Sequence, residues 1–140
     1  MKYHQGRIID HIGVRVSNFQ RSKTFYVAVL DALNKSDAYE GDDSYFCFDE
    51  FYVAEGDDPV TNLHLAFQAE SIEQVQAFYE AGLKAGGKDN GAPGYREYHD
   101  NYYAAFLIDP DGNNIEAVCD VGTERSSESV VISREDGRDD

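Results

Sequence analysis

Two histidines and one glutamate have the types and surroundings expected of metal ligands. His11 and His64 each lie in an apolar stretch, where an unpaired imidazole is costly to bury, and Glu116 is a carboxylate within the otherwise apolar segment 115–119. A buried carboxylate needs a cation or hydrogen-bond donors. Two imidazoles and a carboxylate can hold a divalent first-row ion and leave positions open for water or substrate. We therefore predict one divalent ion (Zn, Ni, Fe, Mn or Co) bound by these three side chains. The alternative is that the histidines are hydrogen-bonded core residues.

The two histidines occupy matching positions of an internal repeat. When the sequence is shifted so that His64 falls on His11, segments 11–30 and 64–83 align without a gap, and most aligned pairs keep their apolar or polar character. The residues that recur are His11 and His64, Phe25 and Phe78, Tyr26 and Tyr79, Ala28 and Ala81, and Leu30 and Leu83. The chain is therefore predicted to contain two copies of one structural unit.

Each copy is predicted to fold as βαβββ. An apolar strand, 8–16 or 62–69, is followed by a helix, capped by Ser17 or Asn18 in the first copy and by Ser71, with Gln74 completing a capping box, in the second. Three short strands follow, at 36–40, 44–48 and 51–55 in the first copy and at 88–95, 102–108 and 114–120 in the second. The second helix is expected to bury one face and to end at Gly86 and Gly87; the residues of that face are Ile72, Val75, Phe78, Tyr79 and Leu83. The fold class is therefore α+β.

Two segments resemble a known family. The segment DPDGNNIE at 109–116 resembles a signature near the end of small glyoxalase-like proteins, and DHIGVRVS at 10–17, followed by Phe25 and Tyr26, resembles their opening strand and helix. With the repeat in register, the chain resembles the glyoxalase/bleomycin-resistance/extradiol-dioxygenase (vicinal oxygen chelate) superfamily over about residues 7–120. The resemblance implies a half-open eight-stranded barrel around a metal site, with His11, His64 and Glu116 as ligands and a small substrate bound through adjacent oxygens.

The resemblance leaves the fourth ligand and the reaction open. Glyoxalase I has a further carboxylate ligand on the last strand of its first module. In this chain the repeat places Tyr52 at the position that matches Glu116. Glu55 lies three residues further on and would face the other side of the strand unless a bulge intervenes. Methylglyoxal-hemithioacetal isomerisation is therefore in doubt, and the ligand set is more similar to that of extradiol dioxygenases or fosfomycin-type transferases. Glu116, Tyr52 and His99 are the candidate catalytic residues. Lyase or isomerase chemistry, ring cleavage and group transfer all stay possible.

A second group of polar and aromatic residues fills the segment 93–103, and the resemblance implies that this segment lies near the barrel mouth. Arg96, Tyr98 and Tyr102 are predicted to bind substrate, and His99 to act as a base or to contact substrate. The alternative is a solvated aromatic loop packed on the barrel rim. No separate organic cofactor is expected.

The composition restricts the partners. The net charge is −15, from 27 acidic and 12 basic residues, so nucleic acids and anionic membrane surfaces are not expected to bind. The same charge fits the alternative function, a metal-free bleomycin-resistance-type protein that sequesters a small cationic ligand. A half-open barrel leaves strand edges exposed, and the resemblance implies that a module of a second chain covers them, so we expect a homodimer. Cys47 and Cys119 are expected to be buried fillers in a cytoplasmic protein without a secretory signal.

The expected domain organisation is simple. A glyoxalase-like domain is predicted at 1–122, with its repeats at about 7–56 and 60–120, and an acidic, mobile tail at 123–140. Such a tail could instead form an edge strand that adds to a partner.

Overall fold

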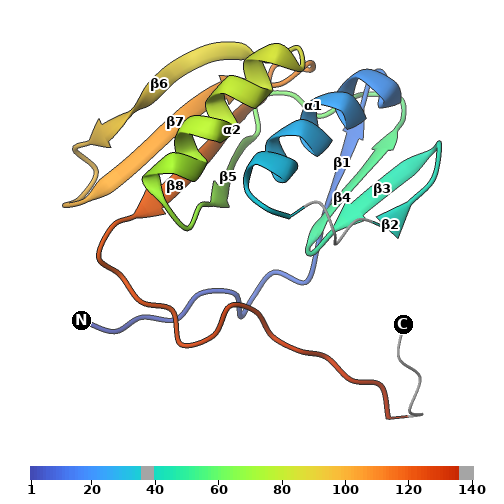
Figure 1. Cartoon of the computed structure of the whole chain (residues 1–140). Coiled ribbons are helices and arrows are strands. Elements are labelled where there is room, and N and C mark those ends of the chain that lie inside the picture. Colours follow the sequence, from blue (N-terminus) through green and yellow to red (C-terminus); the bar gives the residue numbers. More distant parts are fainter. Residues whose placement is uncertain (36–39, 136–140) are drawn as a thin grey trace.

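The protein consists of two similar modules, as seen in a computed structural model that describes residues 1–35 and 40–135 (Figure 1). The first module comprises β1 (Ile12–Val16), α1 (Phe19–Ala32), β2 (Glu40–Gly41), β3 (Tyr45–Phe48) and β4 (Phe51–Glu55). The second comprises β5 (His64–Gln68), α2 (Ile72–Lys84), β6 (Lys88–Arg96), β7 (Tyr102–Ile108) and β8 (Asn114–Asp120). The βαβββ order predicted for each repeat is confirmed. Most of the strand predicted at 36–40 lies outside the described residues.

Each module forms its own four-stranded sheet, and the two sheets have the same topology. Their orders are β1-β4-β3-β2 and β5-β8-β7-β6, with the first pair of each sheet parallel. Gly13 pairs with Tyr52, and Ala66 pairs with Glu116. Gly13 and Ala66 are matching positions of the repeat, so Tyr52 occupies in the first module the place that Glu116 has in the second. The sheets do not close on one another, which agrees with the α+β, half-open architecture predicted.

The two helices lie next to each other and cover the same side of the molecule (Figure 1). Asn18 caps α1 by accepting from the Arg21 amide at 3.0 Å, and Ser71 caps α2 by accepting from the Gln74 amide at 3.1 Å. The predicted capping box is incomplete, because the Gln74 side chain accepts from the Glu70 amide instead. The inclusion of Leu83 in the buried face of α2 was wrong.

Gly82, rather than Leu83, completes the buried face of α2. Leu83 is 39% exposed, whereas Gly82 is buried where α2 approaches α1 and β7. The lack of a side chain at Gly82 allows this close approach. Gly86 adopts a φ of 103° beyond the helix end, and the Gly87 amide donates to the Gly82 carbonyl at 2.8 Å, as the predicted helix end requires.

The turn between β7 and β8 joins the two modules. Asp109 is 4% exposed and accepts from the Asp111 and Asn113 amides, both at 2.9 Å, and also from the phenol of Tyr26 in α1. The Asp111 carboxylate accepts from the Ser17 amide, 3.2 Å from one of its oxygens. The most recognisable motif of the sequence therefore has a structural role: it fixes the start of β8, which carries Glu116.

The Asn113 side chain ties the same turn to the segment that leads into β5. It donates to the Val60 carbonyl at 2.8 Å and accepts from the Leu63 amide at 2.9 Å, immediately before β5. The start of β5 and the start of β8 are thus held together by one buried amide, and these are the two strands that carry His64 and Glu116.

The chain termini and cysteines complete the description. The N-terminal segment and residues 121–135 run outside the two modules, without a helix or strand in their described parts (Figure 1). Cys119 is buried, as expected, whereas Cys47 is only half-buried, and both are free thiols. Among the residues the structure describes, no helix is both long and apolar enough to cross a membrane.

Candidate active site

Glu116 is the buried centre of the candidate site. Its side chain is 2% exposed on β8, and each carboxylate oxygen has a polar side chain beside it. His64, the first residue of the neighbouring strand β5, places Nε2 3.0 Å from Oε1. Tyr102, the first residue of β7, donates its phenol to Oε2. The carboxylate therefore lies between an imidazole and a phenol, supplied by the starts of two other strands of the same sheet.

The strand register explains why these side chains meet. In the parallel pair β5–β8, His64 pairs with Asn114 and Ala66 with Glu116, so alternate residues of both strands face the same side of the sheet. That side is opposite to Ile115 and Ala117, which are fully buried in the core. The Asn113 contacts before β5 and β8 hold this register.

The two nitrogens of His64 both face oxygen atoms. Nδ1 lies 3.3 Å from the Asn114 carbonyl, and Nε2 lies 3.0 Å from Glu116. If Nδ1 carries the proton of a neutral imidazole, the lone pair of Nε2 faces a carboxylate, and this repels unless a proton or a cation lies between them. Two ligand bonds of about 2.1 Å, at a right or tetrahedral angle, separate the ligand atoms by about 3.0–3.4 Å. The pair therefore fits two ligands of one divalent ion.

Tyr102 is held in its protonated form. Burial, followed by the hydrogen bond and the negative charge of Glu116, raises its pKa well above the usual value of a phenol. At neutral pH Tyr102 is consequently a hydrogen-bond donor to Glu116 and not a base. Two rings make edge-to-face contacts with the Tyr102 ring. The ring centre of Tyr98 lies 5.1 Å from that of Tyr102, and the ring centre of His99 lies 5.0 Å from it.

An open cavity of about 440 Å³ lies over these residues. A second space of about 240 Å³ adjoins it and shares Tyr98, Phe106 and Asn114 with it. The lining of the larger cavity is His64, Tyr98, Tyr102, Phe106, Asn114 and Glu116. All of these belong to the second module: five lie on strands of its sheet, and Tyr98 lies in the loop between β6 and β7.

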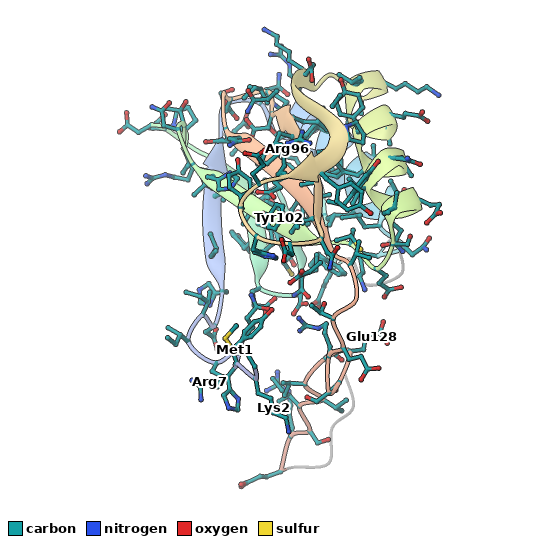
Figure 2. The ribbon with its side chains drawn as sticks, turned by 90° about the vertical axis from the view of Figure 1, so that its left-hand side faces the viewer. Met1, Lys2, Arg7, Arg96, Tyr102 and Glu128 are labelled. Atoms are coloured by element: carbon teal, nitrogen blue, oxygen red, sulfur yellow. The ribbon has the colours of Figure 1, made fainter. Side chains whose placement is uncertain are left out.

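Arg96 lines the smaller space, and Asn90 and Gly91 lie beside it. Arg96 pairs with Tyr102 in the antiparallel ladder of β6 and β7, so both side chains lie on the same face of the sheet. Figure 2 shows the two residues on one side of the molecule. The predicted substrate-binding residues Arg96, Tyr98 and Tyr102 are thus all brought to the cavities.

His11 and Tyr52, which were also predicted as site residues, do not line either cavity. His11 is exposed before β1 and bonds Asp10, with Nδ1 and Oδ1 2.7 Å apart. Tyr52 is 40% exposed and stacks on Tyr45, with ring centres 5.6 Å apart. In the described part of the chain, no three His, Cys, Asp or Glu side chains gather as a metal site. The structure brings His64 and Glu116 together, but it does not bring His11 to them.

Two further predicted residues do not line the cavities. His99 is exposed, its Nδ1 lies 3.0 Å from the Asp100 carbonyl, and it contacts the site only through the ring of Tyr102. Glu55 is exposed at the end of β4, and strand alternation places it with Phe51 and Val53 rather than with Tyr52. The structure therefore gives Glu55 no place beside Glu116.

Phe106, Asn114 and Asn90 line the cavities but were not predicted. Phe106 pairs with Glu116, and Asn114 precedes Glu116 by two residues on the same face. Strand alternation in the predicted segments 102–108 and 114–120 could have identified both. Asn90 enters through the irregular pairing of β6, where the register shifts between Asp89 and Gly91 and between Gly91 and Gly94. Gly91, Pro93 and Gly94 mark an irregular strand in the sequence, but they do not specify that Asn90 faces the cavity.

The fold and the sequence identify the family. A family model described as the Glyoxalase/Bleomycin resistance protein/Dioxygenase superfamily matches residues 8–117. The chain belongs to this superfamily, as its repeat and motifs predicted. The superfamily includes both metalloenzymes and bleomycin resistance proteins, so membership alone leaves the reaction open.

Solved structures agree with this assignment. A glyoxalase/bleomycin resistance protein from Albidiferax ferrireducens T118 is 31% identical, with a TM-score of 0.71 over 81% of this chain and 99% of that chain. A fosfomycin resistance protein, FosX, from Listeria monocytogenes is 19% identical, with a TM-score of 0.59 over 85% of this chain and 94% of that one, and shares the fold. A glyoxalase-related enzyme from Fulvimarina pelagi is 16% identical, with a TM-score of 0.63 over 90% and 98%. No curated protein matches the sequence significantly.

Proposed function

We propose that the protein is a metal-dependent enzyme that acts on a small substrate with vicinal oxygens. The observation that carries this proposal is the buried Glu116 carboxylate facing Nε2 of His64 at 3.0 Å on the floor of an open cavity. Both atoms are suitable ligands for a divalent first-row ion, and their separation suits two ligands of one ion. Within one chain, however, this set has two donors, whereas protein sites of this type use three or more.

We infer that the third ligand is His11 of a second copy of the chain. His11 and His64 are matching residues of the repeat, and each lies at or just before the first strand of its sheet, β1 or β5, at the sheet edge. The sheet faces opposite the helices are uncovered in one chain, as the exposure of Tyr52, Ala66 and Gln68 shows. A twofold pair that places the first sheet of one copy over the second sheet of the other would complete two equivalent sites.

The chemistry follows from the ligands and their neighbours. When bound, a divalent ion supplies Lewis-acid stabilisation of charge that develops on the substrate oxygens. Tyr102 fixes the orientation of Glu116 through its phenol, and Tyr98 and Phe106 provide apolar walls. Tyr52 occupies the place where a carboxylate would act as the fourth ligand, and the exposed Glu55 does not replace it. We therefore do not assign glyoxalase I activity.

Metal analysis tests the proposal. Protein purified without added metal should contain close to one divalent ion per chain, and His64→Ala should lose it. His99→Ala is the matched control, because His99 lies near Tyr102 but outside the proposed ligand set, so its metal content should equal that of the wild type. Equal metal content in the wild type and in His64→Ala would overturn the assignment.

The rival function is metal-free binding of a small cationic ligand. Its support is that the Glu116 carboxylate already accepts a hydrogen bond from Tyr102 and that a protonated His64 would pair with it without a metal, together with the net charge of −15. This function predicts metal-free protein and saturable binding of an organic cation, reduced in Glu116→Gln. Absence of metal in the wild type and such binding together would favour the rival.

A further inference from the structure

We propose that the smaller cavity is an oxyanion subsite centred on Arg96, so that the substrate carries a carboxylate, phosphate or phosphonate group at the end away from Glu116. This inference rests on the proposed function, since it treats the two adjoining cavities as one substrate cleft. It adds the chemical class of the substrate, which neither the fold nor the metal ligands specify.

The guanidinium of Arg96 is held in a fixed orientation. Nη1 donates to the Gly94 carbonyl at 2.9 Å, and Nη2 donates to the Ala92 carbonyl at 2.6 Å. Its carbon lies 5.3 Å from the ring centre of Phe106, so the group packs on an aromatic wall of the cavity. These contacts use two of the five N–H donors of a guanidinium. The remaining donors belong to a group that is already oriented, which lowers the entropic cost of binding an anion.

Two glycines leave space beside this guanidinium. A Cβ at Gly91 would lie 3.2 Å from Nη2 of Arg96 and 3.0 Å from the Phe106 ring, and a Cβ at Gly94 would lie 3.1 Å from Nη1. Gly91 also has a φ of 149°, which disfavours other residues. The bulges of β6 at these glycines therefore curve the strand around the guanidinium without covering it.

Among the residues that the structure describes, no carboxylate lies within ion-pair distance of Arg96, although the sequence has 27 acidic residues. A half-buried, oriented and uncompensated guanidinium in a cavity is suited to bind an anionic group that arrives with a ligand.

The two cavities place this charge at a defined position relative to the metal ligands. Tyr98, Phe106 and Asn114 line both spaces, and the Asn90 amide donates to the Asn114 side chain at 3.0 Å on the side of Arg96. A substrate can therefore lie along the Phe106 ring, with its vicinal oxygens toward His64 and Glu116 and its oxyanion toward Arg96. An organic cation would meet a positive charge at this end, so the subsite also opposes the rival function.

NMR titration of the full-length protein tests the subsite. Inorganic phosphate, methylphosphonate and acetate are added separately, to protein as purified and again after metal removal by a chelator. We expect saturable shifts of the Arg96 Nε–H resonance and of the Gly91 and Tyr98 amides, under both conditions. The relative affinities of the three probes then distinguish a phosphoryl group from a carboxylate.

Arg96→Gln should lower the affinity for the tightest-binding of these anions by about tenfold or more, because it removes a charge-assisted hydrogen-bond donor. Arg7→Gln removes the same charge from the far end of the molecule (Figure 2) and should leave the affinity unchanged. Metal content should be normal in Arg96→Gln, so failure of the subsite is distinguishable from failure of the metal site.

Three results would overturn the subsite. They are an unchanged affinity in Arg96→Gln, the absence of saturable shifts in the wild type, and tighter binding of tetramethylammonium than of every anion at these residues. If Arg96→Gln does not fold, the Arg96 Nε–H resonance of the wild type decides the question alone: saturation supports the subsite, and no shift refutes it.

Discussion

Replacement of Gly82 by alanine is expected to destabilise the protein, although alanine is the better helix former. A Cβ at this position would lie 2.2 Å from Cδ1 of Leu107 and 3.0 Å from Cγ1 of Val29, compared with about 3.5–4.0 Å for ordinary carbon contacts. Leu107 and Val29 are both fully buried, so neither has space to move into. The methyl group must therefore push α2 away from α1 and β7.

The magnitude is the difference between two opposing effects. Overpacking of a core costs about 1–3 kcal/mol, and the 2.2 Å approach belongs at the upper end of that range. The gain in helix propensity is about 1 kcal/mol. We expect a net loss of about 1–2 kcal/mol, which lowers the melting temperature by roughly 3–7 °C for a chain of this size.

Urea denaturation followed by circular dichroism measures this loss, with Ala77→Gly as the matched control. Ala77 is exposed on the same helix, so Ala77→Gly reports the propensity difference without a packing change. If Gly82→Ala instead stabilises the protein by as much as Ala77→Gly destabilises it, the close approach of the two helices is wrong.

One of two further predictions concerns the hydrogen bond of Tyr26 to Asp109 between the modules, and the other concerns the reaction. Burial, and then the Asp109 carboxylate that accepts its hydrogen bond, raise the pKa of Tyr26, so its contribution to stability is complete below the unfolded pKa of about 10 and is lost as the pH rises through the folded value. Tyr26→Phe should therefore lower the free energy of unfolding by about 1–3 kcal/mol at neutral pH. Its difference from the wild type should shrink above pH about 10, and a difference independent of pH in urea titrations would contradict the assignment. Glu55→Gln should retain all metal, and neither it nor the wild type should turn over methylglyoxal with glutathione. Robust wild-type turnover that is lost in Glu55→Gln but kept in Tyr52→Phe would show that Glu55 acts as a ligand and base.

The sequence predicted the modules and much of the site because both depend on local patterns. Alternation and turn residues gave the bounds of β4, β7 and β8 as the structure has them. The repeat placed Tyr52 at the position of Glu116, as the strand register confirms. The strand predicted at 8–16 was too long. The pairing with β4 begins at Ile12, so residues 8–11 do not belong to β1.

What the sequence did not predict depends on contacts between distant elements. Leu83 has helical spacing with the core residues of α2, but the helices approach so closely that Gly82 takes the buried position. The repeat shows that His11 and His64 are equivalent, but it does not show whether two equivalent residues of one chain face each other. That depends on how the modules pack: α1 and α2 contact each other, and one hydrophobic core that includes residues of both modules joins them, which local sequence patterns do not specify.

Metal analysis of mixed subunits tests most directly whether two chains share the site. His11→Ala and Glu116→Ala are purified separately, and each should lack metal. When they are unfolded together, refolded with metal and separated from free ions, half of the dimers should be mixed, and each mixed dimer has one intact site from His11 of one chain and His64 and Glu116 of the other. A shared site therefore predicts about a quarter of an ion per chain in the mixture. Metal content that stays at zero after mixing, while refolded wild type regains a full complement, would contradict it.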